Sequence, residues 1–129
     1  MSNSSIVSIF NQHFIEMFDD ILVIFPNNVD IMTAKNSILT FKKMNPAIII
    51  KVWNKYIANK YKDQIDNDDI SFFINKDYSN DLEYMKNPDV IMDVINRIRE
   101  PVNNMNPSDQ VKTMKYIKNL TKLSLSYSS

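Results

Sequence analysis

The residues whose types most directly suggest chemistry are seven lysines within residues 31–62. No acidic residue occurs in this block, and Trp53, Tyr56 and Tyr61 lie among the lysines. Ammonium groups bind phosphates and aromatic rings stack on bases, so the block is a candidate contact for nucleic acid or another partner. The simpler interpretation is a solvated helical surface, because Trp53, Tyr56 and Ile57 share one helical side, as core residues do. The candidate contact residues are Lys35, Lys42, Lys43, Lys51, Lys55, Lys60 and Lys62.

A second group that could do chemistry is His13, the only histidine, with Glu16 three residues later. This spacing places both side chains on one side of a helix, where the pair could act as a general base. No serine or cysteine pattern that would supply a nucleophile lies near them. We therefore interpret His13 as an ordinary residue at the edge of an apolar stripe.

Four aspartates close together could hold a divalent cation, because calcium and magnesium prefer carboxylate oxygens. The sequence does not match the calcium-loop pattern. Counted from Asp66, Ile70 and Ser71 occupy the fifth and sixth positions, and the sixth requires glycine. A solvated turn whose acids begin the next helix is the simpler interpretation. The residues concerned are Asp63, Asp66, Asp68 and Asp69.

An aromatic group follows the aspartates. Phe72 and Phe73, together with Tyr78 and Tyr84, could anchor a partner protein, since interface hot spots favour aromatic residues. Packing in the core is an equally good interpretation, and the sequence does not decide between the two.

The 129-residue chain contains no glycine and no cysteine. Phosphate-binding loops, nucleophile elbows and dinucleotide fingerprints need glycine, while disulfides, zinc-thiolate sites and thiol nucleophiles need cysteine. With one histidine in addition, very few catalytic schemes remain. The sequence therefore predicts a protein that is not an enzyme, has no catalytic residue and binds neither a cofactor nor a metal.

The elements that would position these residues are helices. Apolar residues recur every three or four positions, and tight hairpins lose their preferred residue when glycine is absent. We predict an all-α, irregular or orthogonal bundle of five to seven helices, in a single domain over residues 1–129. Helices are expected at about 5–25, 29–44, from 45 onward, 90–99 and 108–124, with short ones near 70–74 and 79–86.

Particular residues mark the ends and faces of these helices. Asn28 is a predicted N-cap, and Asn-Pro pairs at Asn45, Asn87 and Asn106 are predicted helix starts, since proline suits the first helical position. Pro101 is expected to stop the helix before it. Trp53 should lie in the core. The last helix should present a narrow apolar stripe of Val111, Met114, Ile117, Leu120 and Leu123.

Charge alternates along the chain in blocks of one sign. Acids dominate residues 1–30, bases 31–62, acids 63–93 and bases 94–129, and the formal net charge is zero. Such blocks predict separately charged faces that could support head-to-tail self-association. No stretch has the length or apolarity of a membrane span or a secretory signal, so we expect a soluble intracellular protein.

Several short patterns spread over residues 10–127 resemble, taken together, a group of short uncharacterised proteins of nucleocytoplasmic large DNA viruses, the giant viruses. Heavy use of Asn, Ile and Lys agrees with the AT-rich genomes of many such viruses. The resemblance implies a viral product located in the host cytoplasm or in the virion. It supplies no catalytic residue. The patterns are Phe25-Pro26-Asn27, Asn45-Pro46, Trp53 with Tyr56 and Tyr61, Phe72-Phe73, Lys76-Asp77-Tyr78, Ile98-Arg99 with Pro101, Lys115-Tyr116-Ile117 and Asn119-Leu120.

These observations lead to two expectations about function. The first is a non-enzymatic interaction or structural protein of a large DNA virus that acts through protein–protein surfaces, including self-association. The alternative is a nucleic-acid-binding protein that uses the basic face of residues 31–62.

Overall fold

The part of the chain that the structure describes is all-helical. The computed structural model describes residues 2–71 and 90–127, and within the second range it leaves out the side chains of residues 90–93 and 95. These ranges contain six α-helices, one π-helical segment and no strand, which confirms the predicted fold class for this part of the chain. The elements are α1 (Asn3–Ile24), α2 (Val29–Met44), α3 (Ile48–Trp53), η1 (Asn54–Ala58), α4 (Lys62–Asp66), α7 (Val90–Asn103) and α8 (Pro107–Ser126).

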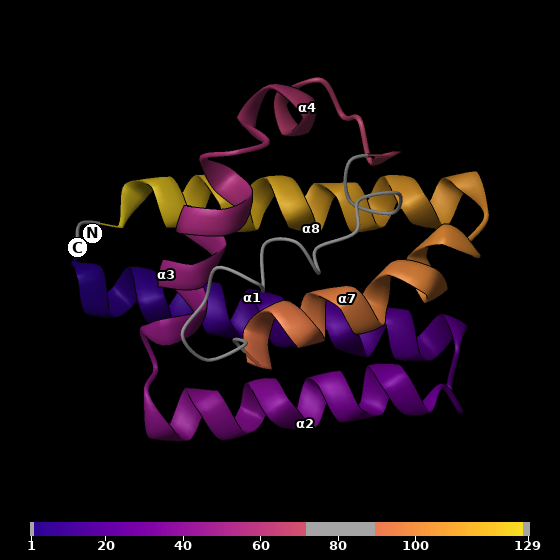
Figure 1. Ribbon diagram of the computed structural model, residues 1–129, viewed down its shortest axis with the longest axis horizontal. Helices are drawn as coiled ribbons and strands as arrows, with labels where there is room; N and C mark the ends of the chain where they lie inside the picture. The colour runs from indigo at the N-terminus through magenta and orange to yellow at the C-terminus, as the bar shows by residue number, and fades with distance from the viewer. Residues whose placement is uncertain (1, 72–89, 128–129) are drawn as a thin grey trace.

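Helix α1 is central to the arrangement. It packs between the antiparallel α2 on one side and α8 on the other, while α7 lies against α2 (Figure 1). Helix α3 and its continuation η1 cross α1 and α8 at the end of the bundle where α1 begins and α8 ends (Figure 1). None of the described helices is long and apolar enough to cross a membrane.

The core is built around the aromatic face of α1. Phe10, Phe14 and Phe18 recur every four residues, and all three are fully buried. Trp53 of α3 is also fully buried, and its ring meets that of Phe14 edge-on at 5.5 Å between centroids. The prediction that Trp53 is a core residue is confirmed. Ile9, expected on the same apolar face of α1, is instead 41% exposed.

Two of the predicted helix starts are confirmed, and one is wrong. The side chains of Asn28 and Asn106 accept hydrogen bonds from backbone N–H groups three residues ahead, at 3.0 and 2.8 Å. Asn45 instead ends α2, because its own N–H donates to the carbonyl of Phe41. Helix α3 begins only at Ile48. The pair at residues 87–88, most of the short helix expected near 70–74 and the one expected near 79–86 lie outside the described residues.

A π-helical turn replaces the second half of the third helix that the sequence predicts as continuous. The N–H of Asn59 donates to the carbonyl of Asn54 at 3.1 Å, a five-residue step. A π turn holds more residues than an α turn, so side chains after it rotate relative to those before it. Ile57 and Ala58, which follow the fully buried Trp53, are therefore both fully buried as well.

Two expectations about the last two helices are wrong. Pro101 lies inside α7, which continues to Asn103. Less than one turn follows the proline, and Asn104 N–H still bonds the carbonyl of Glu100 at 3.0 Å. The stripe on α8 also fails at one end, because Val111 is 57% exposed. Three residues turn through only about 300°, so a strict three-residue stripe winds out of the core.

Candidate nucleic-acid interface

Five exposed lysines lie on consecutive elements along one end of the bundle, and we call this set the lysine edge. It begins at the C-terminal end of α2, follows α3 and η1 across the bundle and reaches the start of α4 (Figure 1). Among residues 2–71 and 90–127, no carboxylate lies within ion-pair distance of any of the five. The members of the lysine edge are Lys42, Lys43, Lys51, Lys55 and Lys62.

The local fold explains why these five lysines are exposed. Helix α3 buries Ile49, Ile50, Val52 and Trp53 against the bundle, so Lys51 and Lys55, four residues apart, remain on its outer side. The Lys55 ammonium lies 5.3 Å from the centre of the Tyr56 ring. Lys42 and Lys43 occupy the last turn of α2, where a cation also complements the helix dipole.

The other two lysines of the basic block differ from these five. Lys35 is half-buried in the middle of α2 and makes an ion pair with Asp19 of α1. Lys60 is exposed, but it already makes an interaction within the protein. The structure therefore brings five of the seven predicted residues to one end, where no carboxylate of the described ranges pairs with them, and it separates Lys35 from them.

A hollow of about 490 Å³ adjoins the lysine edge between the start of α1 and the α2–α3 turn. Lys42 lines it, with Ser4, Ser8 and Tyr127. Asn11 is 1% exposed at its base and donates a 2.9 Å hydrogen bond from Nδ2 to the carbonyl of Pro46. This bond fixes the α2–α3 turn, and with it the path of the lysine edge, onto α1.

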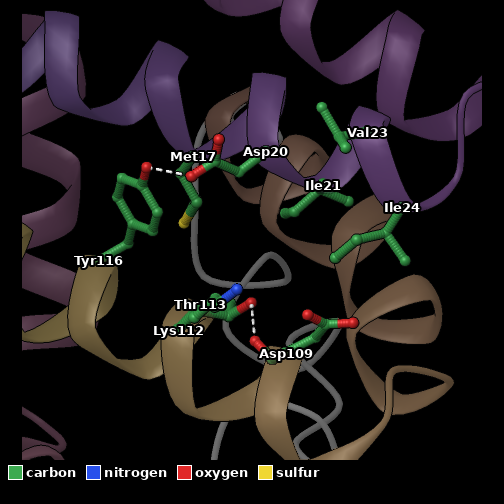
Figure 2. A pocket seen from close by; sticks show the side chains of 9 residues that line it. All are labelled: Met17, Asp20, Ile21, Val23, Ile24, Asp109, Lys112, Thr113 and Tyr116. Carbon is green, nitrogen blue, oxygen red and sulfur yellow. Dashed lines mark hydrogen bonds between the residues drawn. The ribbon is translucent and has the colours of Figure 1, made fainter.

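His13 and Glu16 lie in a second region, the contact between α1 and α8. His13 Nδ1 is 3.5 Å from Glu16 Oε2, and the imidazole ring lies 4.7 Å from the Tyr116 ring. Tyr116 donates a hydrogen bond to a carboxylate oxygen of Asp20 (Figure 2). Burial first, then this bond and the nearby carboxylates, raise the pKa of Tyr116 to about 12. The histidine ring thus lies between α1 and α8.

A hollow of about 250 Å³ lies next to Tyr116 and has an apolar base. Met17 and Ile21 of α1 face Thr113 and Lys112 of α8, and Asp109 lies at the far end (Figure 2). Thr113 Oγ1 donates to the backbone carbonyl of Asp109 at 3.1 Å and is therefore satisfied within its own helix. This hollow is therefore explained by the packing of α1 against α8, with charged side chains at its rim.

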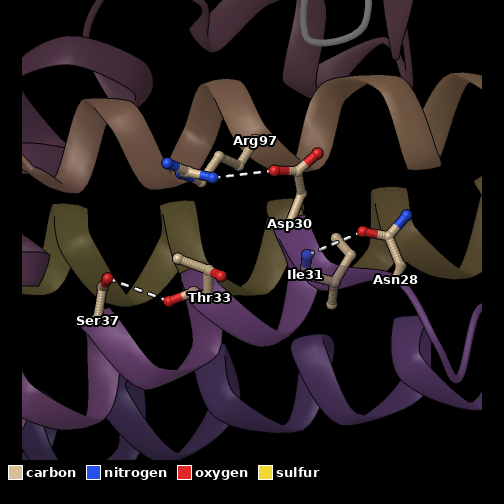
Figure 3. A network of polar contacts seen from close by, with 6 residues as sticks. All are labelled: Asn28, Asp30, Ile31, Thr33, Ser37 and Arg97. Atoms are coloured by element: carbon tan, nitrogen blue, oxygen red, sulfur yellow. Dashed lines mark hydrogen bonds and ion pairs between the residues drawn. The ribbon is translucent and has the colours of Figure 1, made fainter.

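The arginines lie on α7, away from the lysine edge. Arg97 donates a 2.9 Å hydrogen bond to Asp30 Oδ1 at the start of α2, beside the Asn28 cap (Figure 3). The Arg97 and Asp30 side chains are 37% and 58% exposed, so this ion pair contributes at most about 1 kcal/mol. Arg97 thus helps to hold α7 on α2.

The aspartate cluster is divided among different contacts. Asp68 pairs with Lys118 at 3.0 Å, and Asp69 Oδ1 accepts from the N–H of Ser71 at 3.1 Å. Asp68 has a φ of 57°, a left-handed position that glycine usually fills and that this glycine-free chain gives to aspartate. Within the described ranges, no three histidine or acidic side chains lie close enough to hold a metal together. A helix, α4, precedes the turn and was not predicted.

The predicted aromatic anchor, Phe72, Phe73 and Tyr78, lies outside the described residues. The structure adds two polar contacts that the sequence did not indicate, Tyr116 with Asp20 and Asn11 with Pro46. Their partners are separated by 96 and 35 residues, so only knowledge of which helices pack together could have found them.

Comparisons with known proteins give no match: no protein family, no curated protein and no solved structure matches the chain. The giant-virus origin that the resemblance implies therefore stays a prediction. Any functional conclusion must come from the chemistry of the surface.

Proposed function

We propose that the protein acts by binding rather than by catalysis, and that it binds nucleic acid through the lysine edge. The observation that supports this function is the set of five exposed lysines on one end of the bundle that have no carboxylate partner within residues 2–71 and 90–127. Ammonium groups without a carboxylate partner among the described residues are available to phosphates, and binding then releases the counterions condensed on the nucleic acid.

The contrast with the paired lysines strengthens the proposal. Lys35 and Lys118 each lie against a carboxylate from another part of the chain, Asp19 and Asp68. Some lysines elsewhere on the surface are therefore paired with carboxylates, whereas no described carboxylate pairs with the lysine edge. Asp63 and Asp66 of α4 follow Lys62 and form the boundary of the basic surface.

The experiment compares two double variants with the same change in net charge. Lys51→Gln/Lys55→Gln removes two charges from the lysine edge. Lys112→Gln/Lys115→Gln removes two exposed charges from α8, which also lack a carboxylate partner among the described residues. Binding to a fluorescently labelled nucleic acid is followed by anisotropy in dilute salt.

Each lysine–phosphate contact contributes about eightfold in affinity at about 0.1 M salt, so losing two contacts should weaken binding at least tenfold. The α8 variant should stay within about twofold of the wild type. Equal losses in both variants would show that net charge alone governs binding, and no binding by the wild type would remove the proposal.

A protein partner is the second candidate, favoured by exposed apolar side chains where α1 turns into α2. Val23 and Val29 are 80% and 72% exposed, and Ile24 lines the apolar hollow beside them. Large exposed apolar groups mark interaction surfaces when they occur together. Val23→Asp/Val29→Asp should then abolish a specific complex, or self-association measured by light scattering, and leave nucleic-acid binding unchanged.

A further inference from the structure

We infer that the nucleic acid bound by the lysine edge is a duplex. The lysines contact only its phosphates and do not recognise the base sequence. This inference rests on the proposed function and adds the form of the partner to it. Three features of the described surface carry it: the burial of the aromatic rings, the absence of arginine from the lysine edge and the placement of the lysines on successive helical segments.

The first feature is that the aromatic rings of the basic block are buried or partly buried. Proteins that hold single strands stack successive bases on exposed rings beside a basic groove. Here Trp53 is fully buried, and Tyr56 and Tyr61 are partly buried against the core. No aromatic side chain among the described residues is fully exposed. On the described part of the surface, a single strand would thus gain the charge contacts but not the stacking that normally favours it.

The second feature is that the described lysine edge contains no arginine and no projecting helix. Arginine reads guanine with two parallel hydrogen bonds, but the only arginines, Arg97 and Arg99, lie on α7. Asn54 is engaged with the carbonyl of Ser124 and with Asn59. Helix α3 buries one side against α1 and α8, so it does not project as a recognition helix would.

The third feature is that the lysines sit on rigid helices in an extended row. Helices α3 and η1 contain six and five residues, which extend about 16 Å at 1.5 Å per residue. Lys42 and Lys43 lie beyond one end of this span and Lys62 beyond the other. A duplex offers a stiff backbone with one charge per about 1.7 Å of axis, so lysines spread along helical segments can contact it without the cost of ordering a flexible strand.

The test measures affinity for four labelled probes of about 20 nucleotides per strand: two DNA duplexes of unlike sequence, one RNA duplex and one single-stranded DNA. At about 0.1 M salt we expect the DNA duplexes to bind within about twofold of each other and at least fivefold more tightly than the single strand. Lys51→Gln/Lys55→Gln should weaken both DNA duplexes equally, while Lys112→Gln/Lys115→Gln leaves them unchanged. Tighter binding of the RNA duplex also supports the inference and identifies A-form geometry as the preferred partner.

Trp53 fluorescence gives an independent readout. It should not be quenched by any probe, because the ring is fully buried and cannot stack. A single strand that binds as tightly as the duplexes, or that quenches Trp53, overturns the duplex inference but leaves the proposed function standing. A preference of more than about tenfold between the DNA duplexes overturns phosphate-only binding. Absence of binding to all four probes removes the proposed function itself.

Discussion

Replacing Trp53 tests the packing that positions the lysine edge. The indole ring is fully buried, lies edge-on to Phe14, and donates its N–H to Thr121 Oγ1 at 3.1 Å. Trp53→Ala leaves a cavity under α3 in addition to losing this contact area, and we expect a loss of about 3–5 kcal/mol in the free energy of unfolding. Thr121→Val keeps the ring but leaves a buried N–H without an acceptor, which should cost about 1–3 kcal/mol.

Urea unfolding followed by circular dichroism measures both variants against Val111→Ala. Val111 is 57% exposed, so its truncation should change the free energy of unfolding by no more than about 0.5 kcal/mol. A domain of this size is stable by about 5–15 kcal/mol, so the loss expected for Trp53→Ala is a large part of the total. A loss below about 1 kcal/mol would show that Trp53 does not support α3 as described.

Two further predictions concern single contacts. The pKa of Tyr116 is raised from 10 in the unfolded chain to about 12 in the folded protein, so folding favours the neutral phenol. The contribution of this group to stability is therefore complete below pH 10 and disappears as the pH rises through 12. A pH series of unfolding free energies should therefore fall less steeply above pH 10 in Tyr116→Phe than in the wild type, and parallel curves would contradict this. Lys35→Gln should change both stability and nucleic-acid affinity little, by at most about 1 kcal/mol in stability, because the ion pair with Asp19 is partly open to solvent and lies away from the lysine edge. A loss of affinity as large as that of Lys51→Gln/Lys55→Gln would extend the binding surface onto α2.

Local signals in the sequence were sufficient for much of the helical pattern. The bounds of α2 were predicted as observed, because Asn28 caps one end and Asn45 follows the last helical residue. The burial of Trp53 followed from helical spacing alone. The start of α3 was wrong since an Asn-Pro pair serves equally to end one helix or to begin the next, and tertiary packing decides which.

The candidate surface was only partly predictable from the sequence. The absence of acids within residues 31–62 identified the basic block, but it could not separate Lys35 from the others. Asp19, which pairs with Lys35, lies 16 residues earlier on another helix. Likewise, the π turn at η1 has no known sequence signature, although it fixes which side of the segment is buried.

The salt dependence of duplex binding tests the central claim most directly. Five phosphate contacts predict that the logarithm of the affinity falls against the logarithm of the salt concentration with a slope of about −4.5. Lys51→Gln/Lys55→Gln should reduce the magnitude of this slope by about 1.8, while Lys112→Gln/Lys115→Gln leaves it unchanged. A slope near zero, or one that neither variant alters, would contradict the assignment of the lysine edge as a phosphate-binding surface.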